Sequence, residues 1–295
     1  MKNWAFWKLG ACRMLVTNLI VGWARSSCNV LWERVAILHP ILFKEMALDI
    51  NDYTLIVGLA FLVAGFVKGV TGMGLPPIAI GLMAVAVAPV QAAALIVVPS
   101  MVSNVWQMLI GPGFWIALRR FAGLLVMVCI GAAFGVGVLT GSTPAYATLV
   151  LGLVLFVYAV LGLFKFNMHV NASQERWASP LVGGLTGFLA GATGVSSVPS
   201  APYMNSLGMD KDELLQALGL VFTVGTFALA VGLYLKGRFE LAAAWESTLC
   251  LIPTMAGVLA GQKCRALLSA ETFKTVFFLG LLLLGSYMIA RVLWL

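Results

Sequence analysis

Apolar segments of about 20 residues follow one another along most of this chain, with short polar connections between them. A helix of this length spans the hydrocarbon core of a bilayer. Because that core offers no partners to free backbone N–H and C=O groups, a spanning segment of this kind is helical. The sequence therefore predicts an all-α, polytopic integral membrane protein. The predicted segments are Tyr53–Lys68, Leu75–Ala88, Val90–Ile110, Phe121–Thr140, Ala145–Phe164, Pro180–Ala192, Val198–Gly208, Leu214–Leu235, Leu241–Gly261 and Phe273–Leu293.

A single membrane domain is predicted over residues 51–295. Hydrophobic residues make up 61% of the chain and charged residues 10%, against about 45–50% and 25% in soluble domains. Residues 1–50 differ, because charges interrupt each apolar run, and the best run, Met14–Ala24, is short for a crossing. This extension is interpreted as an interfacial or signal-peptide-like segment, or as sequence upstream of a true start at Met46.

Several classes of protein are excluded by composition. The net charge of +7 comes from dispersed basic residues, which indicates cytoplasmic loops and not a nucleic-acid surface. The five cysteines include no C-x-x-C pair, and the two histidines, His39 and His169, lie outside the strong apolar segments. The sequence therefore predicts no metal site, no cofactor, no catalytic residue and no enzyme. It also contains no phosphate-binding loop for the direct use of ATP.

The stretch Gly65–Pro77 places a charge, glycines and prolines inside an apolar region. Gly72 and Gly74 permit a turn, and Pro76 and Pro77 remove two backbone donors, so the preceding helix is predicted to end here. A lysine in apolar surroundings costs several kcal/mol unless it is paired or hydrated. Intramembrane charges usually face a pathway. Lys68 is therefore a candidate site residue in a broken helix.

The same pattern occurs twice. Gly65-x-x-x-Gly69-x-Thr71-Gly72-x-Gly74-x-x-Pro77 aligns with Gly187-x-x-x-Gly191-x-Thr193-Gly194-x-Ser196-x-x-Pro199, and Phe66 aligns with Phe188. Further on, Gln91-Ala92 aligns with Gln216-Ala217, and Gly131-x-x-x-Gly135 with Pro253-x-x-x-Gly257. The chain is predicted to contain two repeats, residues 55–164 and 178–293.

Loop charges suggest how the repeats are oriented. Three predicted loops carry basic residues and are placed in the cytoplasm: Arg119 and Arg120, then Lys165 and Arg176, then Lys263, Arg265 and Lys274. The segment pair around Gly194 then enters and leaves on one side, so each repeat is a re-entrant hairpin plus three crossings. An odd number of crossings inverts the second repeat, as is usual in secondary transporters. In the alternative, each broken pair crosses once and the repeats are parallel.

These duplicated motifs resemble the TauE/SafE (DUF81) family of sulfite and organosulfonate exporters. The resemblance covers about residues 53–293. It implies a carrier of about eight helical elements in a bacterial inner membrane, which moves sulfur-containing or related organic anions. The family motif falls on Gly65, Gly69, Gly72, Gly74 and Pro77, then on Gly187, Gly191, Gly194 and Pro199. The second motif departs from the pattern, since Ser196 and Ser197 stand where glycines are common.

An anion site is predicted between the two broken helices. A helix that begins just after Gly74 or Ser196 presents backbone N–H groups and the positive end of its dipole to the turn. Lys68 adds a full positive charge. The candidate substrate-binding residues combine this cation, turn glycines and polar side chains: Lys68, Thr71, Gly72, Gly74, Gln91, Ser100, Asn104, Thr193, Gly194, Ser196, Ser197 and Gln216.

Each of these residues also has a structural interpretation. The G-x-x-x-G pairs often serve close helix packing, and membrane serines and threonines often bond their own backbone. Lys68 can reach an interface along its alkyl chain, while Gln91 and Gln216 can cap or bridge helices. Glu246 lies within the span Leu241–Gly261 and is either an interfacial glutamate or a carboxylate that couples proton entry to anion exit.

The predicted function is secondary transport of a small organic or sulfur-containing anion, such as sulfite, a sulfonate or a carboxylate. A passive anion channel and a membrane subunit of a larger complex are the alternatives. The expected partners are the anionic substrate and the lipid bilayer, without nucleic acid, and assembly into a homo-oligomer is left open.

Overall fold

A computed structural model describes residues 53–84, 86–111, 113–164, 170–239, 241–265 and 270–294. The chain divides into two compact units, Met1–Thr54 and Leu55–Leu295, and nearly all of these residues belong to the second unit. The predicted extension at residues 1–50 lies outside the described residues.

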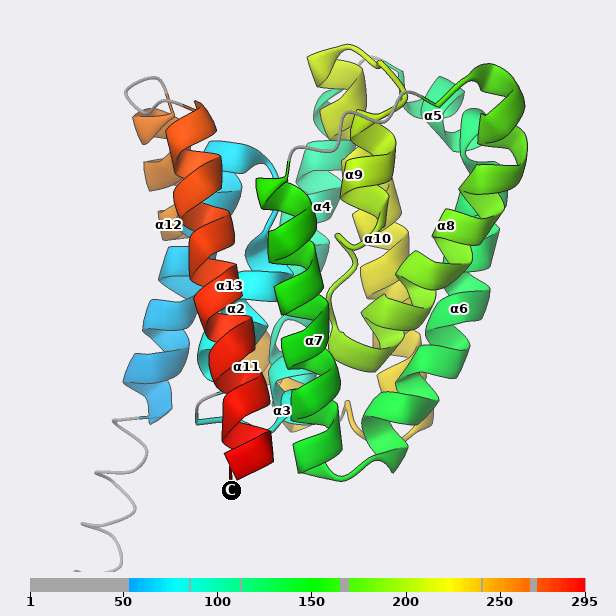
Figure 1. Ribbon diagram of the computed structural model, residues 1–295. Helices are drawn as coiled ribbons and strands as arrows, with labels where there is room; N and C mark the ends of the chain where they lie inside the picture. The colour runs from blue at the N-terminus through cyan, green and yellow to red at the C-terminus, as the bar shows by residue number, and fades with distance from the viewer. Residues whose placement is uncertain are drawn as a thin grey trace, which may run out of the picture. The chain divides into compact units, whose positions relative to one another are not determined.

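The first repeat begins with the helix Tyr53–Thr71 (Figure 1). It continues with α2 (Leu75–Met83), α3 (Pro89–Leu95), α4 (Val97–Ile110), α5 (Phe114–Arg120), α6 (Ala122–Gly141) and α7 (Pro144–Leu163). The second repeat contains α8 (Ala172–Thr193), α9 (Ser200–Asn205), α10 (Lys211–Leu235), α11 (Leu241–Leu249), α12 (Leu251–Cys264) and α13 (Ala270–Trp294).

All regular elements in the described part of the chain are helices. Six helical segments are long and apolar enough to cross a membrane, one of which, Ala243–Cys264, joins α11 and α12; α3 with α4, bent by 44°, would make a seventh span. Because no water satisfies backbone groups inside a bilayer, this all-helical content is what the apolar composition requires. The prediction of an all-α, polytopic membrane protein is confirmed.

The broken segments differ from the prediction in length. The sequence indicates four half-length segments, but the first member of each pair is long: Tyr53–Thr71 has 19 residues and α8 has 22. Pro180 lies inside α8 instead of starting it. The helix starts earlier because Asn171 N–H donates to Gln174 Oε1 at 3.1 Å, a capping contact that satisfies an end of the backbone. Of the four segments in the two hairpins, only α2 and α9 are short.

Glycine pairs bring helices of opposite repeats into backbone contact. A Cβ at Gly65 would lie 2.3 Å from Thr254 O, and one at Gly69 would lie 2.3 Å from Val258 O, so the first helix touches α12 directly. On the other side, a Cβ at Gly187 would lie 2.0 Å from Val128 O, so α8 touches α6. The packing interpretation of the G-x-x-x-G pairs is therefore confirmed.

These contacts correct the sequence alignment of the repeats. Gly131 of α6 approaches Gly184 O and Phe188 N of α8, and Gly257 of α12 approaches the equivalent Leu62 O and Phe66 N. The structural counterpart of Gly131 is thus Gly257, one helical turn beyond the Pro253 of the sequence alignment. The second repeat therefore contains a longer insertion before this glycine than the sequence alignment assumes.

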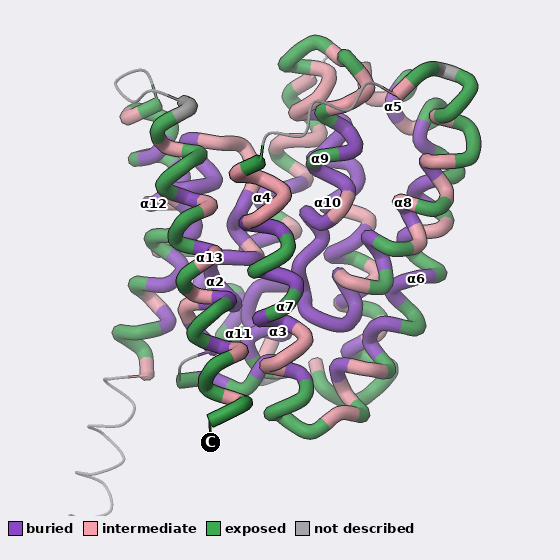
Figure 2. The backbone as a smooth tube through the Cα atoms, in the orientation of Figure 1, coloured by how far each residue is buried: buried purple, intermediate pink, exposed green. Residues whose placement is uncertain are grey.

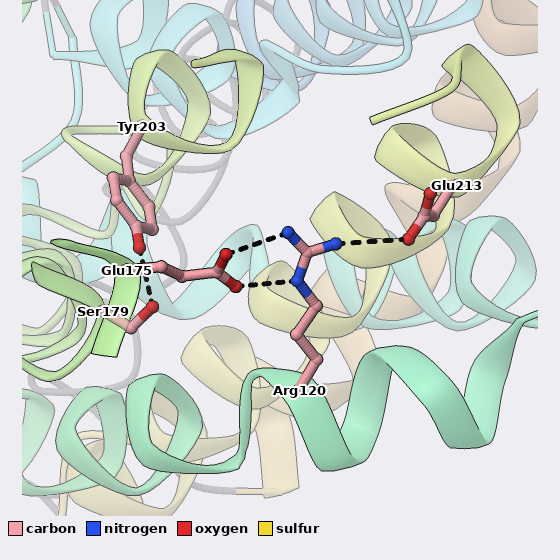
Figure 3. A network of polar contacts seen from close by, with 5 residues as sticks. All are labelled: Arg120, Glu175, Ser179, Tyr203 and Glu213. Atoms are coloured by element: carbon pink, nitrogen blue, oxygen red, sulfur yellow. Dashed lines mark hydrogen bonds and ion pairs between the residues drawn. The ribbon is translucent and has the colours of Figure 1, made fainter. Parts of the chain in front are cut away.

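Polar contacts join the two ends of the second hairpin to each other and to α5 (Figure 3). Arg120, at the end of α5, contacts Glu175 at 2.7 Å near the start of α8 and Glu213 at 3.5 Å near the start of α10. Its hydrogen bond to Glu175 raises the pKa of Arg120 above the ordinary value. One turn further along α8, Ser179 Oγ lies 2.7 Å from the hydroxyl of Tyr203 in α9. The chain therefore enters α8 and returns through α9 to the same end.

The first hairpin opens toward the other end. Arg291, near the end of α13, donates to Ala84 O just after α2, at 3.4 Å. In Figure 1 the C-terminal end of α13 lies at the bottom and the start of α8 at the top, while α7 and its counterpart α13 run in opposite directions. The repeats are thus inverted, and the parallel alternative is wrong.

The two ends of the bundle differ in the number of basic residues. Figure 1 shows the end of α5, the starts of α8, α10 and α13 and the end of α12 at the top, and the ends of α10 and α13 at the bottom. At or next to the first set of helix ends the described chain has Arg119, Arg120, Arg176, Lys211, Lys263, Arg265 and Lys274, together with the acidic Glu175, Asp210, Asp212 and Glu213. At or next to the second set it has Lys236, Arg238 and Arg291. The cytoplasmic location of the Arg120 end stays a prediction from the positive-inside bias.

Gly187→Ala is expected to lower the stability of the folded protein by at least about 2 kcal/mol, because its Cβ would overlap a backbone carbonyl that cannot move without the helix. Gly137→Ala is the matched control, since a Cβ there meets nothing within 4 Å. It is expected to be neutral or slightly stabilising. Thermal unfolding in detergent measures both, and equal melting temperatures would contradict the packing role.

Candidate substrate-binding site

Lys68 lies in the last turn of the first helix and is 6% exposed. Its Nζ donates to Oδ1 of Asn104 in α4. Nδ2 of Asn104 is in turn 3.4 Å from Oγ1 of Thr226 in α10, so the cluster joins three helices from both repeats. Lys68 and Asn104 are both predicted site residues, and the structure brings them together. Thr226 was not predicted, because a single threonine in an apolar span carries no sequence signal.

No carboxylate neutralises Lys68 among the residues that the structure describes. The ion pairs found there are those of Arg120, at the end of the bundle. Removing an ammonium from water costs several kcal/mol, and one neutral amide offsets only part of that cost. The positive charge of Lys68 is therefore uncompensated among the described residues, and a bound anion would compensate it.

A buried hydroxyl next to this cluster makes no hydrogen bond in the described structure. Ser100 lies one turn before Asn104 on the same face of α4 and is fully buried. A buried hydroxyl without a partner costs about 1–3 kcal/mol. Ser197, in the turn of the second hairpin, is also buried, and its hydroxyl lies beside that of Tyr158. Both serines are predicted site residues, and the Ser100 hydroxyl is free to donate to a ligand.

The two hairpin turns each depend on a glycine in the left-handed region. Gly72 has φ 80° and donates to Lys68 O at 2.7 Å, and Gly194 has φ 78° and donates to Ala190 O at 2.8 Å. A side chain would be strained at either position. A Cβ at Gly72 would also lie 2.6 Å from Leu215 Cδ2 of the second repeat, and one at Gly194 would lie 2.5 Å from Ile80 Cδ1 of the first. Each turn therefore packs into the other repeat.

Tyr158 of α7 meets both turns and was missed by the sequence analysis. Its hydroxyl donates to Met73 Sδ of the first turn at 3.8 Å and lies beside Ser197 of the second. Its ring packs edge-on against Phe277 and Phe278 of α13. A tyrosine within an apolar span gives no motif to recognise. It places a buried hydroxyl where the two hairpins meet.

The predicted threonines are held by their own backbone. Thr71 Oγ1 donates to Val67 O at 2.9 Å or to Met73 O at 2.7 Å, and Thr193 Oγ1 donates to Leu189 O at 2.7 Å. Each hydroxyl also accepts a backbone N–H two residues later. These contacts stabilise the helix ends at the turns. Ser196 is buried close to Gly225, the neighbour of Thr226.

The helix N-termini after the turns offer fewer donors than expected. Gly74, with φ 95°, precedes α2, but Pro76 and Pro77 in its first turn have no N–H, and Ile78 N–H already donates to Gly74 O. On the other side, α9 has only six residues. The side chains around Lys68 are therefore the main polar groups of the site.

Gln216 holds a turn of the first repeat. Its Oε1 accepts from Gly113 N–H at 2.8 Å, and its Nε2 donates to Met108 O at 2.9 Å and Gly111 O at 2.6 Å. These bonds fix the α4–α5 connection. The amide is used by the protein itself, in agreement with the bridging interpretation.

Gln91 and Glu246 lie away from the Lys68 cluster. With Arg238 they line a pocket of about 310 Å³ near the end of α10, and all three side chains are exposed. The structure thus places Glu246 at a surface. Nearby, Ser247 Oγ donates to Leu95 O at 2.7 Å and accepts from Val98 N–H at 3.0 Å, which supports the break between α3 and α4.

The residues that the structure describes contain no group of histidine, cysteine, aspartate or glutamate side chains able to hold a metal ion.

Inverted, interlocked repeats with broken helices around a central polar cluster are the architecture of membrane transporters. A family model described as "Sulfite exporter TauE/SafE" matches residues 57–288. The chain belongs to this family of multi-pass membrane transporters. Comparisons with curated proteins and with solved structures gave no match at the threshold applied.

Gln216→Leu is expected to destabilise the protein by about 2–3 kcal/mol, because three hydrogen bonds to the α4–α5 turn are lost. Anion affinity of the folded fraction is expected to stay within about twofold of wild type, a change below 1 kcal/mol. Melting temperature and isothermal titration test both statements. Gln107→Leu, which loses one bond to Leu215 O, is a milder control. Loss of affinity at unchanged stability would make Gln216 a substrate ligand.

Proposed function

We propose that this protein is a secondary transporter for small oxyanions, namely sulfite, an organosulfonate or a related carboxylate, in the inner membrane of a bacterium. The observation that supports this most directly is the buried ammonium of Lys68, which bonds a neutral amide and no described carboxylate. An anionic substrate supplies the charge that this site lacks.

The polar groups of the proposed site suit an oxyanion. Ser100 contributes a hydroxyl without a partner in the described structure, and the hydroxyls of Tyr158 and Ser197 lie beside each other where the hairpins meet. All three donate to oxygen, and an ammonium adds a charge-assisted bond. A sulfite, sulfonate or carboxylate group offers several oxygens in one compact ion. The site thus matches the charge and the hydrogen-bonding capacity of such a substrate.

The arrangement of the two hairpins is suited to an alternating-access mechanism. Each turn packs against the other repeat, so movement of one repeat changes the surroundings of the site from both sides. The hairpins open toward opposite ends of the bundle, so each side of the membrane meets one of them. Rocking of inverted repeats about a fixed central site is the common mechanism of secondary carriers. No nucleotide is required for it, and transport then follows the gradients of substrate and coupling ion.

Counterflow in proteoliposomes tests transport. Vesicles loaded with unlabelled sulfite, sulfoacetate or taurine are expected to take up the same labelled compound faster than unloaded vesicles, with saturation. Protein-free liposomes are the control. Linear uptake that ignores the trans compartment would indicate a passive channel. Uptake equal to that of protein-free liposomes for all compounds would overturn the proposed function.

Lys68→Ala is expected to weaken binding of the transported anion by about 10- to 100-fold, because a charge-assisted hydrogen bond is lost. Lys68→Arg keeps the charge and is expected to retain part of the affinity. Lys236→Ala, at an exposed lysine near the end of α10, is the matched control and leaves affinity unchanged. Isothermal titration and uptake measure the effect. Equal affinity in all four proteins would remove Lys68 from the site.

A further inference from the structure

An elongated apolar crevice of about 490 Å³ lies between the first helix, α2 and α13. Val63 and Val67 line it from the first helix, and Ile78 and Leu82 line it from α2. The third wall is one face of α13 and runs from Phe273 to Tyr287. A helical rise of about 1.5 Å per residue makes this wall roughly 21 Å long. That length exceeds one leaflet of the hydrocarbon core, which is about 15 Å.

The rim of the crevice belongs to the lipid-facing surface. Val63, Val276 and Leu283 are 46%, 62% and 72% exposed, and Figure 2 shows exposed residues along the outer side of α13. In a multi-pass membrane protein such a face meets hydrocarbon. An apolar cavity offers water no hydrogen-bond partners. Its natural occupant is therefore apolar and chain-like.

One end of the crevice carries a cation. Arg291 follows Tyr287 by one turn of α13, and so lies on the same face near the helix end. Its guanidinium donates to Ala84 O at 3.4 Å, and the residue is exposed at the surface. A phosphate at the membrane surface matches this group in charge and geometry. An apolar groove that ends at an arginine fits a phospholipid better than the apolar face of another helix.

We propose that one phospholipid binds here, with an acyl chain in the crevice and its phosphate near Arg291. The bound chain packs behind the first hairpin turn, because Phe277 lines the crevice and its ring atoms lie 3.1 Å from the position of a Cβ at Gly74. The same ring contacts Tyr158 edge-on. The lipid thus supports the α2 hairpin from outside. This inference does not depend on the identity of the transported anion.

Gly280 provides a direct test, since it lines the crevice and a Cβ there meets nothing within 4 Å. Gly280→Phe fills the crevice without displacing protein atoms at Cβ. Gly137→Phe in α6 is the matched control, an exposed helical glycine with equally open space outside the crevice. Binding of palmitoyl-oleoyl-phosphatidylglycerol to each purified full-length protein in detergent is measured by native mass spectrometry.

Wild type and Gly137→Phe are expected to hold one tightly bound phospholipid. Gly280→Phe is expected to bind it at least about tenfold more weakly, since burial of two methylene groups is worth that much. Equal binding by all three proteins overturns the proposal, as does a wild-type protein without a tightly bound lipid. A shift from dimer to monomer in Gly280→Phe alone assigns the crevice to a second copy of the chain and also overturns it. If Gly280→Phe does not fold, Gly280→Val places a smaller side chain in the crevice for the same comparison.

Discussion

Backbone contact between helices of opposite repeats is the constraint on which this fold depends. A membrane interior provides little hydrophobic drive for helices to associate, so association relies on close packing. In this protein the close packing needs glycines on both helices of each pair, because a backbone carbonyl oxygen of one helix lies where a Cβ of the other would be. The contacts cross between the repeats, the first helix with α12 and α8 with α6. The two hairpins are consequently held in place by the opposite half of the molecule, because the Gly72 turn packs against Leu215 and the Gly194 turn against Ile80.

The fold was largely predictable because its signals are periodic or repeated. Spanning length, the duplicated glycine motif and the loop arginines led to inverted repeats with hairpins. The start of α8 was misplaced because Pro180 resembles a helix start, whereas the capping contact at Asn171 lies in a polar stretch that the apolar search ignored. The pairing of Gly131 with Gly257 was also missed. The sequence alignment placed Gly135 over Gly257 because the two residues are identical. Only the backbone carbonyls that each glycine contacts show which positions of the two repeats are equivalent.

The site was predictable only in part, since polar residues in a membrane serve both structure and substrate. Lys68, Asn104 and Ser100 share one polar region, as expected from a buried charge and helical spacing. Thr71 and Gln216 have side chains that could equally bind a substrate, but their hydrogen bonds go to the backbone of the protein. Tyr158 and Thr226 gave no signal, because each is a single polar residue whose importance comes from neighbours distant in sequence. The unsatisfied hydroxyl of Ser100 could be found only from three-dimensional contacts.

The exchange of helices between repeats also affects how the chain is made. The first helix is among the earliest spanning segments to leave the ribosome, yet its glycine partner in α12 is about 190 residues further along the chain. At about 5–20 residues per second, the first helix waits for roughly 10–40 s in the bilayer or the insertion machinery. The waiting helix is the one that carries Lys68. α8, by contrast, emerges after its partner α6 is already in place. The order of synthesis thus differs between the two matched contacts, and the helix that holds the charge gains its glycine partner only when α12 is made.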